Sequence, residues 1–159
     1  MRFWPASVLA IVSATLVAGA TAATHLMDWP DLLRRPLPRA DERLAYGTGQ
    51  NQFGDLWVPA TPGRRPLVIM IHGGCWHARV ATLSIMNYPA DDLRRRGFVV
   101  WNIEYRGVDQ AGGGYPGTFL DVAAAADALR TIAPAHHLDL GRVVVVGHSA
   151  GGHLAAWLA

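Results

Sequence analysis

The sequence predicts an α/β fold in which a pair of antiparallel strands leads into a parallel sheet with flanking helices. Two observations support this prediction. Continuous apolar runs of strand length occur at 67–74, 98–105 and 143–146, as expected for strands covered on both faces. Helix-like segments at 83–97 and 118–133 separate these runs, and strands that alternate with helices imply right-handed crossovers between parallel strands.

Composition excludes several classes of protein. The 159 residues fit one domain, and 51% of them are apolar, which is too many for a disordered chain. The net charge is +2, and the 14 basic residues, all arginine, are scattered along the sequence. We therefore expect no nucleic-acid partner, because such a partner needs a dense basic face. The single cysteine, Cys75, allows no intrachain disulfide and no thiolate zinc site, and we expect no metal and no cofactor.

Residues 1–22 have the pattern of a secretory signal peptide. Arg2 precedes an apolar stretch from Val8 to Val17, and Ala20 and Ala22 supply an A-x-A cleavage site. An uncleaved membrane anchor is the alternative, but the apolar stretch is short for a span of ~20 residues. We therefore expect export to the periplasm or the medium, with no stable membrane span after cleavage.

Local signals place the remaining elements. Prolines at 30, 36 and 38 predict an extended lead-in over 23–43, before a domain at 44–159. Aromatic and β-branched runs at 44–46 and 53–58 predict the antiparallel pair. Thr118 and Asp121 have the spacing of a capping box at the start of a helix, and 139–142 has the composition of a turn.

The stretch Gly147-His148-Ser149-Ala150-Gly151 matches the pattern G-x-S-x-G. It follows four valines and precedes a helical run, which is the strand–turn–helix context that the pattern requires. The two glycines leave room for a turn that strains the backbone of Ser149 and lifts its hydroxyl above the sheet edge. The helix that follows points backbone N–H groups toward this hydroxyl. We therefore interpret Ser149 as a nucleophile rather than as a helix-capping serine.

A second motif, HGGCW at 72–76, ends the first apolar run. Attack on an acyl carbon places negative charge on oxygen, and two or more N–H groups are needed to stabilise it. The glycines let the backbone approach a substrate, which makes Gly74 and Cys75 the candidate donors, together with Ala150 after the nucleophile. In this interpretation Cys75 acts through its backbone rather than its sulfur, and His72, Gly73 and Trp76 support the loop. The alternative is an ordinary glycine-rich loop at a strand end.

Together these motifs resemble the α/β-hydrolase superfamily, and its carboxylesterase and lipase-like branch in particular. The HGG-x-W form is similar to that of feruloyl esterases and kynurenine formamidases, and the resemblance covers about residues 44–159. It implies an eight-stranded, mostly parallel sheet and a Ser-His-Asp triad that hydrolyses small-molecule carboxylic esters through an acyl-enzyme. It carries over Ser149 as the nucleophile and Gly74, Cys75 and Ala150 as oxyanion donors. Amide hydrolysis, by a formamidase or a peptidase, is the alternative within the same fold.

The sequence departs from this family where the triad should be completed. The family places an acid and then a histidine after the nucleophile, but no acidic residue follows Ser149 and the only later histidine is His153. His148 is expected to be structural and to point away from the nucleophile. Glu104 lies near the end of a strand, and we expect it to pair with Arg106. We therefore interpret the sequence as the N-terminal part of a longer hydrolase, inactive alone; a non-enzymatic truncated chain is the further alternative.

Overall fold

The computed structural model describes residues 28–159, in two parts that divide after Arg35 and are treated separately. The segment expected to be a signal peptide, 1–22, lies outside the described residues. Within 28–159, no helix has both the length and the apolar character needed to cross a bilayer.

The prolines predicted an extended lead-in, but part of it is helical. Helix α1 spans Trp29–Arg34. Asp28 and Asp31 exchange hydrogen bonds across its first turn, because each backbone N–H donates to the other carboxylate, at 3.3 and 2.9 Å. Pro30 falls in that first turn, where the missing N–H costs no helical hydrogen bond. The helix ends before Pro36, which disfavours a helical conformation in the residue that precedes it.

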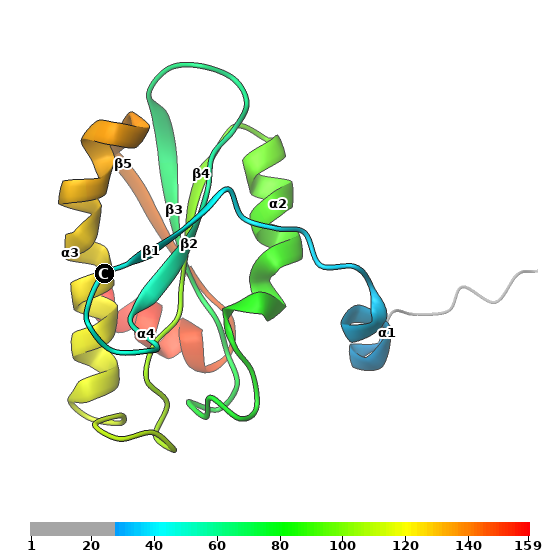
Figure 1. Ribbon diagram of the computed structural model, residues 1–159, viewed down its shortest axis with the longest axis vertical. Coiled ribbons are helices and arrows are strands. Elements are labelled where there is room, and N and C mark those ends of the chain that lie inside the picture. The colour runs from blue at the N-terminus through cyan, green and yellow to red at the C-terminus, as the bar shows by residue number, and fades with distance from the viewer. Residues whose placement is uncertain (1–27) are drawn as a thin grey trace, which may run out of the picture. The chain divides into compact units, whose positions relative to one another are not determined.

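Residues 36–159 form a five-stranded sheet flanked by helices (Figure 1). The strand order is β1-β2-β4-β3-β5, with β2 antiparallel to β1 and to β4, and β3 parallel to β4 and to β5. The predicted antiparallel pair and parallel sheet are confirmed. The strands are β1 Glu42–Ala45, β2 Phe53–Trp57, β3 Arg65–Ile71, β4 Val99–Ile103 and β5 Leu138–Gly147.

Helices cover both faces of this sheet, as Figure 1 shows with α3 and α2 on opposite sides. One core cluster joins α3 and α4 to the sheet through Val122, Leu129 and Leu154, and the other joins Ala90 of α2 and Met86, which directly precedes α2, to the opposite face. The helices are η1 Leu83–Met86 (a 3-10 turn), α2 Asn87–Arg95, α3 Gly117–His136 and α4 Ala150–Leu158.

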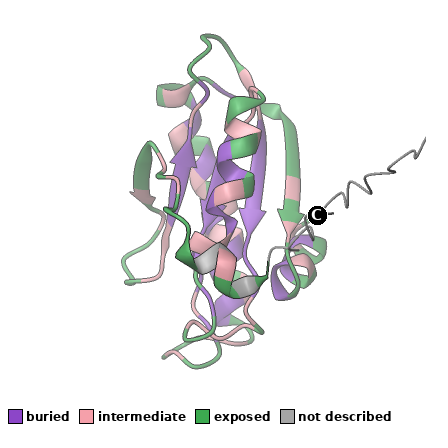
Figure 2. Ribbon diagram, turned by 90° about the vertical axis from the view of Figure 1, so that its right-hand side faces the viewer, coloured by how far each residue is buried: buried purple, intermediate pink, exposed green. Residues whose placement is uncertain are grey.

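Strand β5 differs from its prediction as a buried strand. It begins at Leu138, so the expected turn at 139–142 lies inside it, and it forms one edge of the sheet. Val143, Val144 and Val146 are 38%, 58% and 39% exposed. Figure 2 shows this strand in green and pink beside the purple central strands. An unbroken apolar run predicts burial on both faces, but within 28–159 no strand pairs with the outer side of β5.

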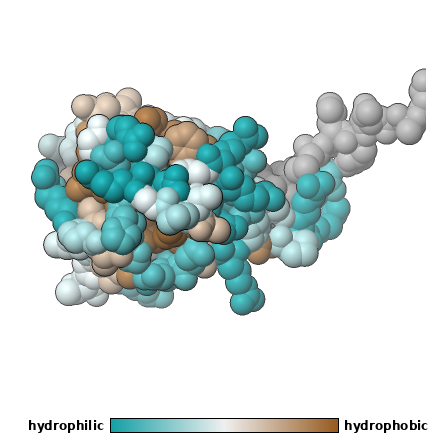
Figure 3. Space-filling model, turned by 90° about the horizontal axis from the view of Figure 1, so that it is seen from above, coloured by the Kyte–Doolittle hydropathy of each residue, from teal (hydrophilic) through white to brown (hydrophobic). Residues whose placement is uncertain are grey.

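The strand register aligns the two sequence motifs at one end of the sheet. Ile71, the last residue of β3, pairs with Ile103 on one side and with Gly147 on the other. The residues that follow these three strands therefore meet at a single edge, which is where active sites gather in open α/β sheets. Figure 3 views the molecule from the opposite end, the top of Figure 1, where hydrophilic residues cover much of the surface.

Candidate active site

Ser149 stands in a strained turn between β5 and α4. Its φ and ψ are 53° and −117°, a conformation that non-glycine residues rarely adopt. The turn leaves no room for side chains at the flanking glycines. A Cβ on Gly151 would lie 2.5 Å from the His72 carbonyl oxygen, and one on Gly147 would lie 2.5 Å from the Gly152 nitrogen. The two glycines of the pattern are therefore required by the close approach of backbone segments.

The HGGCW loop lies directly against this turn. A Cβ on Gly73 would lie 2.8 Å from the His148 carbonyl oxygen and 3.1 Å from the Ser149 Cβ. Gly74, Cys75 and Trp76 follow with φ values of 118°, 54° and 60°, three successive residues in the left-handed region. Strain of this kind persists only where surrounding contacts hold it, and it gathers at functional sites. The structure thus brings the two predicted motifs together.

The predicted N–H donors have no partner within residues 28–159. The backbone N–H groups of Gly74, Cys75 and Ala150 make no hydrogen bond there, whereas the neighbouring N–H groups of His77 and Gly151 donate to carbonyl oxygens. Ala150 is the first residue of α4, so its N–H also lies at the positive end of the helix dipole. These three free donors belong to the loop and the helix that meet at Ser149, and donors of this kind suit an anionic oxygen.

Glu104 does not pair with Arg106, as had been expected. Its Oε1 lies 2.7 Å from Nε2 of His72, and both side chains are less than 5% exposed. The sequence contains a signal for this pairing, because each residue directly follows one of two neighbouring parallel strands. Tyr105 stacks on the His72 ring at 4.3 Å and donates its hydroxyl hydrogen to the His72 carbonyl at 2.9 Å. Burial, followed by the nearby Glu104 charge, raises the pKa of Tyr105, which keeps this donor protonated.

Arg106 instead binds Asp121 of α3 through two guanidinium hydrogen bonds of 2.7 and 2.6 Å and a backbone N–H hydrogen bond of 3.0 Å. Asp121 is 1% exposed and also accepts from Gln52 at 2.7 Å. Burial alone raises the pKa of Asp121, but the hydrogen bonds from Arg106 and Gln52 outweigh it and hold this pKa below its usual value. The predicted capping box is therefore wrong: Asp121 binds Arg106, and Thr118 donates to the Arg106 carbonyl at 2.5 Å.

Asp109 fixes the segment that follows the HGGCW loop. Its carboxylate accepts hydrogen bonds from the N–H groups of Ala78 and Arg79, at 2.9 and 3.2 Å. The bond from Ala78 is the main reason why the pKa of Asp109 lies below its usual value. The glycine-rich stretch 107–117 thus supports the candidate site from outside.

Two histidines flank Ser149 in sequence, and neither resembles a triad base. His153 makes edge-to-face contacts with Trp76 and Phe119, at 5.7 Å in both cases, and within residues 28–159 it is paired with no carboxylate. His148 does not point away from the site as expected, because its Nδ1 would be 2.7 Å from a Cβ on Gly73. Trp76 reaches His153 and so joins the HGGCW loop to α4.

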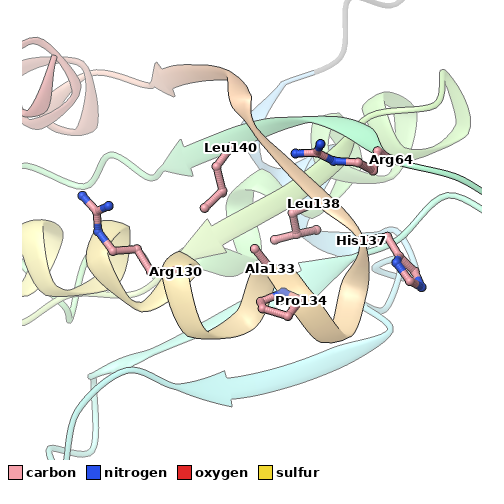
Figure 4. Close-up of a pocket in the computed structure, with 7 residues that line it drawn as sticks. All are labelled: Arg64, Arg130, Ala133, Pro134, His137, Leu138 and Leu140. Atoms are coloured by element: carbon pink, nitrogen blue, oxygen red, sulfur yellow. The ribbon is translucent and has the colours of Figure 1, made fainter.

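One groove of the structure lies away from this site. It holds about 380 Å³ between the end of α3 and the start of β5, at the residues labelled in Figure 4. The ten residues of β5 span ~30 Å, so Ser149, beyond its far end, is distant from this groove. The groove contains no nucleophile, and Arg64 and Arg130 beside it pair with Asp139 and Asp127. Within 28–159 no group of three or more potential ligand side chains could hold a metal ion.

Known proteins are similar to this chain in sequence and in fold. The chain is 32% identical over 157 residues to the non-reducing polyketide synthase ausA of Aspergillus calidoustus, covering 90% of this chain and 6% of that protein. It is 32% identical over 120 residues to Esterase LipC of Mycobacterium tuberculosis, covering 72% of this chain and 28% of that protein. The butyrate-bound esterase Est2 of Thermogutta terrifontis superposes with a TM-score of 0.65 at 25% identity, covering 72% of this chain and 42% of that one.

The chain spans less than half the length of each of these three proteins. The match to a family is broader. Residues 55–159, which include both motifs and the parallel part of the sheet, match the sequence model of the BD-FAE family. The chain belongs to the BD-FAE family.

Proposed function

We propose that the full-length protein is a serine hydrolase that cleaves carboxylic esters of small molecules through an acyl-enzyme on Ser149. One observation carries the proposal: Gly73 packs against Ser149, and the free N–H groups of Gly74 and Cys75 directly follow it in the loop. The esterases LipC and Est2 support an ester rather than an amide as substrate.

In the proposed first step, Oγ of Ser149 attacks the ester carbonyl carbon and its proton passes to a general base. The carbonyl oxygen becomes an oxyanion, and the N–H groups of Gly74, Cys75 and Ala150 stabilise it. The bond to the alcohol oxygen then breaks, the base returns the proton to the leaving alcohol, and the acyl group remains on Ser149. A water molecule repeats the sequence on the acyl-enzyme and releases the carboxylic acid.

The general base lies outside the groups assigned here. His153 has aromatic neighbours and no orienting acid within 28–159, and an unoriented imidazole is a poor base in a serine hydrolase. We place the base and its acid in the portion of the esterase fold that these 159 residues do not span. Without them the chain retains at most the oxyanion donors, which in serine hydrolases supply about 10³–10⁴-fold acceleration over water.

We also propose export from the cytoplasm, on the basis of the apolar stretch and A-x-A site within residues 1–22. N-terminal sequencing of the protein recovered from culture is expected to show a start near residue 23. A mature protein that still begins at Met1 would contradict cleavage.

The function is tested with p-nitrophenyl acetate and p-nitroacetanilide on the full-length protein. We expect ester hydrolysis that exceeds anilide hydrolysis, and its loss in Ser149→Ala. Ser84→Ala is the matched control, because Ser84 lies on η1 and its hydroxyl contacts only Thr82 among the hydrogen bonds found. Ester hydrolysis that persists in Ser149→Ala would refute the assignment, and a preference for the anilide would favour amide hydrolysis.

A further inference from the structure

Glu104 is a buried carboxylate next to the candidate site, and it has no role in the proposed mechanism. Its carboxylate contacts His72 of the HGGCW loop and the backbone N–H groups of Tyr105 and Leu83. Oε1 faces Nε2 of His72 at 2.7 Å and accepts from the N–H of Tyr105 at 3.2 Å, while Oε2 accepts from the N–H of Leu83 at 3.0 Å. Two backbone N–H groups and one imidazole nitrogen thus hold the carboxylate in place.

His72 in turn contacts the next residue of the loop, Gly73. Its Nδ1 lies 2.6 Å from the carbonyl oxygen of Gly73. The imidazole is therefore held from both sides, by Glu104 at one nitrogen and by Gly73 at the other, and Tyr105 stacks against its face.

The held carbonyl determines where an N–H group points. The peptide bond between Gly73 and Gly74 is planar and trans, so its N–H points opposite to its C=O. Because the Gly73 carbonyl points toward His72, the Gly74 N–H points away from His72. The next peptide is fixed in the same way, since the Gly74 carbonyl accepts from the N–H of His77 at 2.9 Å.

We infer that Glu104 is a positioning residue for the oxyanion donors: acting through His72, it fixes the Gly73–Gly74 peptide and so aims the Gly74 N–H at the reacting oxygen. The inference rests on the proposed function. A carboxylate that only stabilised the fold would affect unfolding but not the chemical step. A positioning carboxylate affects the chemical step itself, because the oxyanion forms in the transition state and not in the bound ester.

The test compares Glu104→Gln with wild type in the full-length protein, using p-nitrophenyl acetate. Each carboxylate oxygen accepts from one backbone N–H group, that of Tyr105 or that of Leu83, and glutamine has only one acceptor oxygen, so one of these two N–H groups loses its acceptor. We expect kcat to fall roughly 10–100-fold, below the 10²–10³-fold cost of removing an oxyanion donor outright. KM should stay within about twofold, since ground-state binding is unchanged.

Asp55→Asn is the matched control. Asp55 on β2 is also buried, at 5% exposed, and its carboxylate binds Arg43 on the neighbouring strand β1. We expect this variant to lower the unfolding temperature while kcat stays within about twofold of wild type. An equal loss of kcat in both variants at equal thermal destabilisation would overturn the inference, as would an unchanged kcat in Glu104→Gln.

Tyr105→Phe keeps the inference testable if Glu104→Gln does not fold. It removes only the hydroxyl that donates to the His72 carbonyl, and we expect kcat to fall about threefold to tenfold with KM unchanged. A wild-type kcat in a folded Tyr105→Phe would then overturn the inference. Ser149→Ala separates the two hypotheses: if it stays active, the proposed function fails and the inference with it, whereas an inactive Ser149→Ala beside a fully active Glu104→Gln refutes the inference alone.

Discussion

Two adjacent glycines at the start of α4 differ in the space around them. A Cβ on Gly151 would collide with the backbone of Ile71 and His72, whereas the nearest atom to a Cβ on Gly152 is a carbonyl oxygen at 3.4 Å, an ordinary contact. Neither glycine has a positive φ. Packing against the end of β3 therefore requires glycine at one position and not at the other.

The matched variants Gly151→Ala and Gly152→Ala test this difference in the full-length protein. We expect Gly151→Ala to lower the free energy of unfolding by roughly 1–3 kcal/mol, as overpacking does. Gly152→Ala should leave it unchanged or raise it by up to about 1 kcal/mol, because alanine favours helix. Thermal unfolding measures both, and equal melting temperatures would contradict the packing around Ser149.

Asp121 makes stability depend on pH. Its pKa is lower in the folded protein than in the unfolded chain, so the stabilisation is present above the ordinary carboxyl range and is lost as pH falls through the folded pKa. We expect Asp121→Asn to destabilise the protein by roughly 1–3 kcal/mol at pH 7, by leaving Arg106 without its partner. We also expect a shallower loss of stability between about pH 4 and pH 2 than in wild type.

Asp127→Asn on the same helix is the control for this measurement. Asp127 is 76% exposed and has only a 3.5 Å contact with Arg130, so the substitution should be nearly neutral. Denaturant unfolding at a series of pH values compares the three proteins. A wild-type pH profile for Asp121→Asn would show that this buried pair does not contribute to acid sensitivity.

At the scale of elements, β5 is the exposed edge of the sheet. Its outer backbone groups have no strand partner within 28–159, and Val144 is 58% exposed. An apolar, unpaired edge strand promotes association between chains. We therefore expect the 159-residue chain to self-associate through β5.

Val144→Lys tests this expectation, because a charge on an edge strand opposes pairing. Leu120→Lys is the matched control: Leu120 has the same exposed fraction, 58%, but lies on helix α3. Light scattering after size-exclusion chromatography should show a larger monomer fraction for Val144→Lys and no change for Leu120→Lys. A monomeric wild-type chain would contradict the role of the edge.

Periodicity and turn signals predicted most elements, and their failures have physical causes. Buried strands β3 and β4 and helix α3 lie close to their predicted positions, because long apolar runs and helical spacing reflect packing within one layer. Helix α1 in the lead-in was not predicted, because prolines usually interrupt a helix, although they are tolerated in its first turn. The exposure of β5 depends on which strands pair with it, and its own valine run gives no information on that pairing.

At the scale of the whole molecule, the candidate site joins segments that are far apart in sequence. The two motifs were predictable because each carries its own local constraint, a glycine turn beside a strand end. The pairing of Glu104 with His72 was not predicted: the sequence places each residue directly after a strand, but it does not give the register between β3 and β4 that brings the two side chains together. The partner of Arg106 was not predicted either. Its nearest acid in sequence is Glu104, but in the fold it pairs with Asp121 of α3.

The central claim is that Ser149 is the nucleophile of this fold. Treatment of the full-length protein with a fluorophosphonate, followed by intact-mass and peptide-mass measurement, tests it most directly. The account predicts one phosphonyl adduct per chain, located on the peptide that contains Ser149, and none in Ser149→Ala. An unmodified protein, or an adduct that persists in Ser149→Ala, would contradict it.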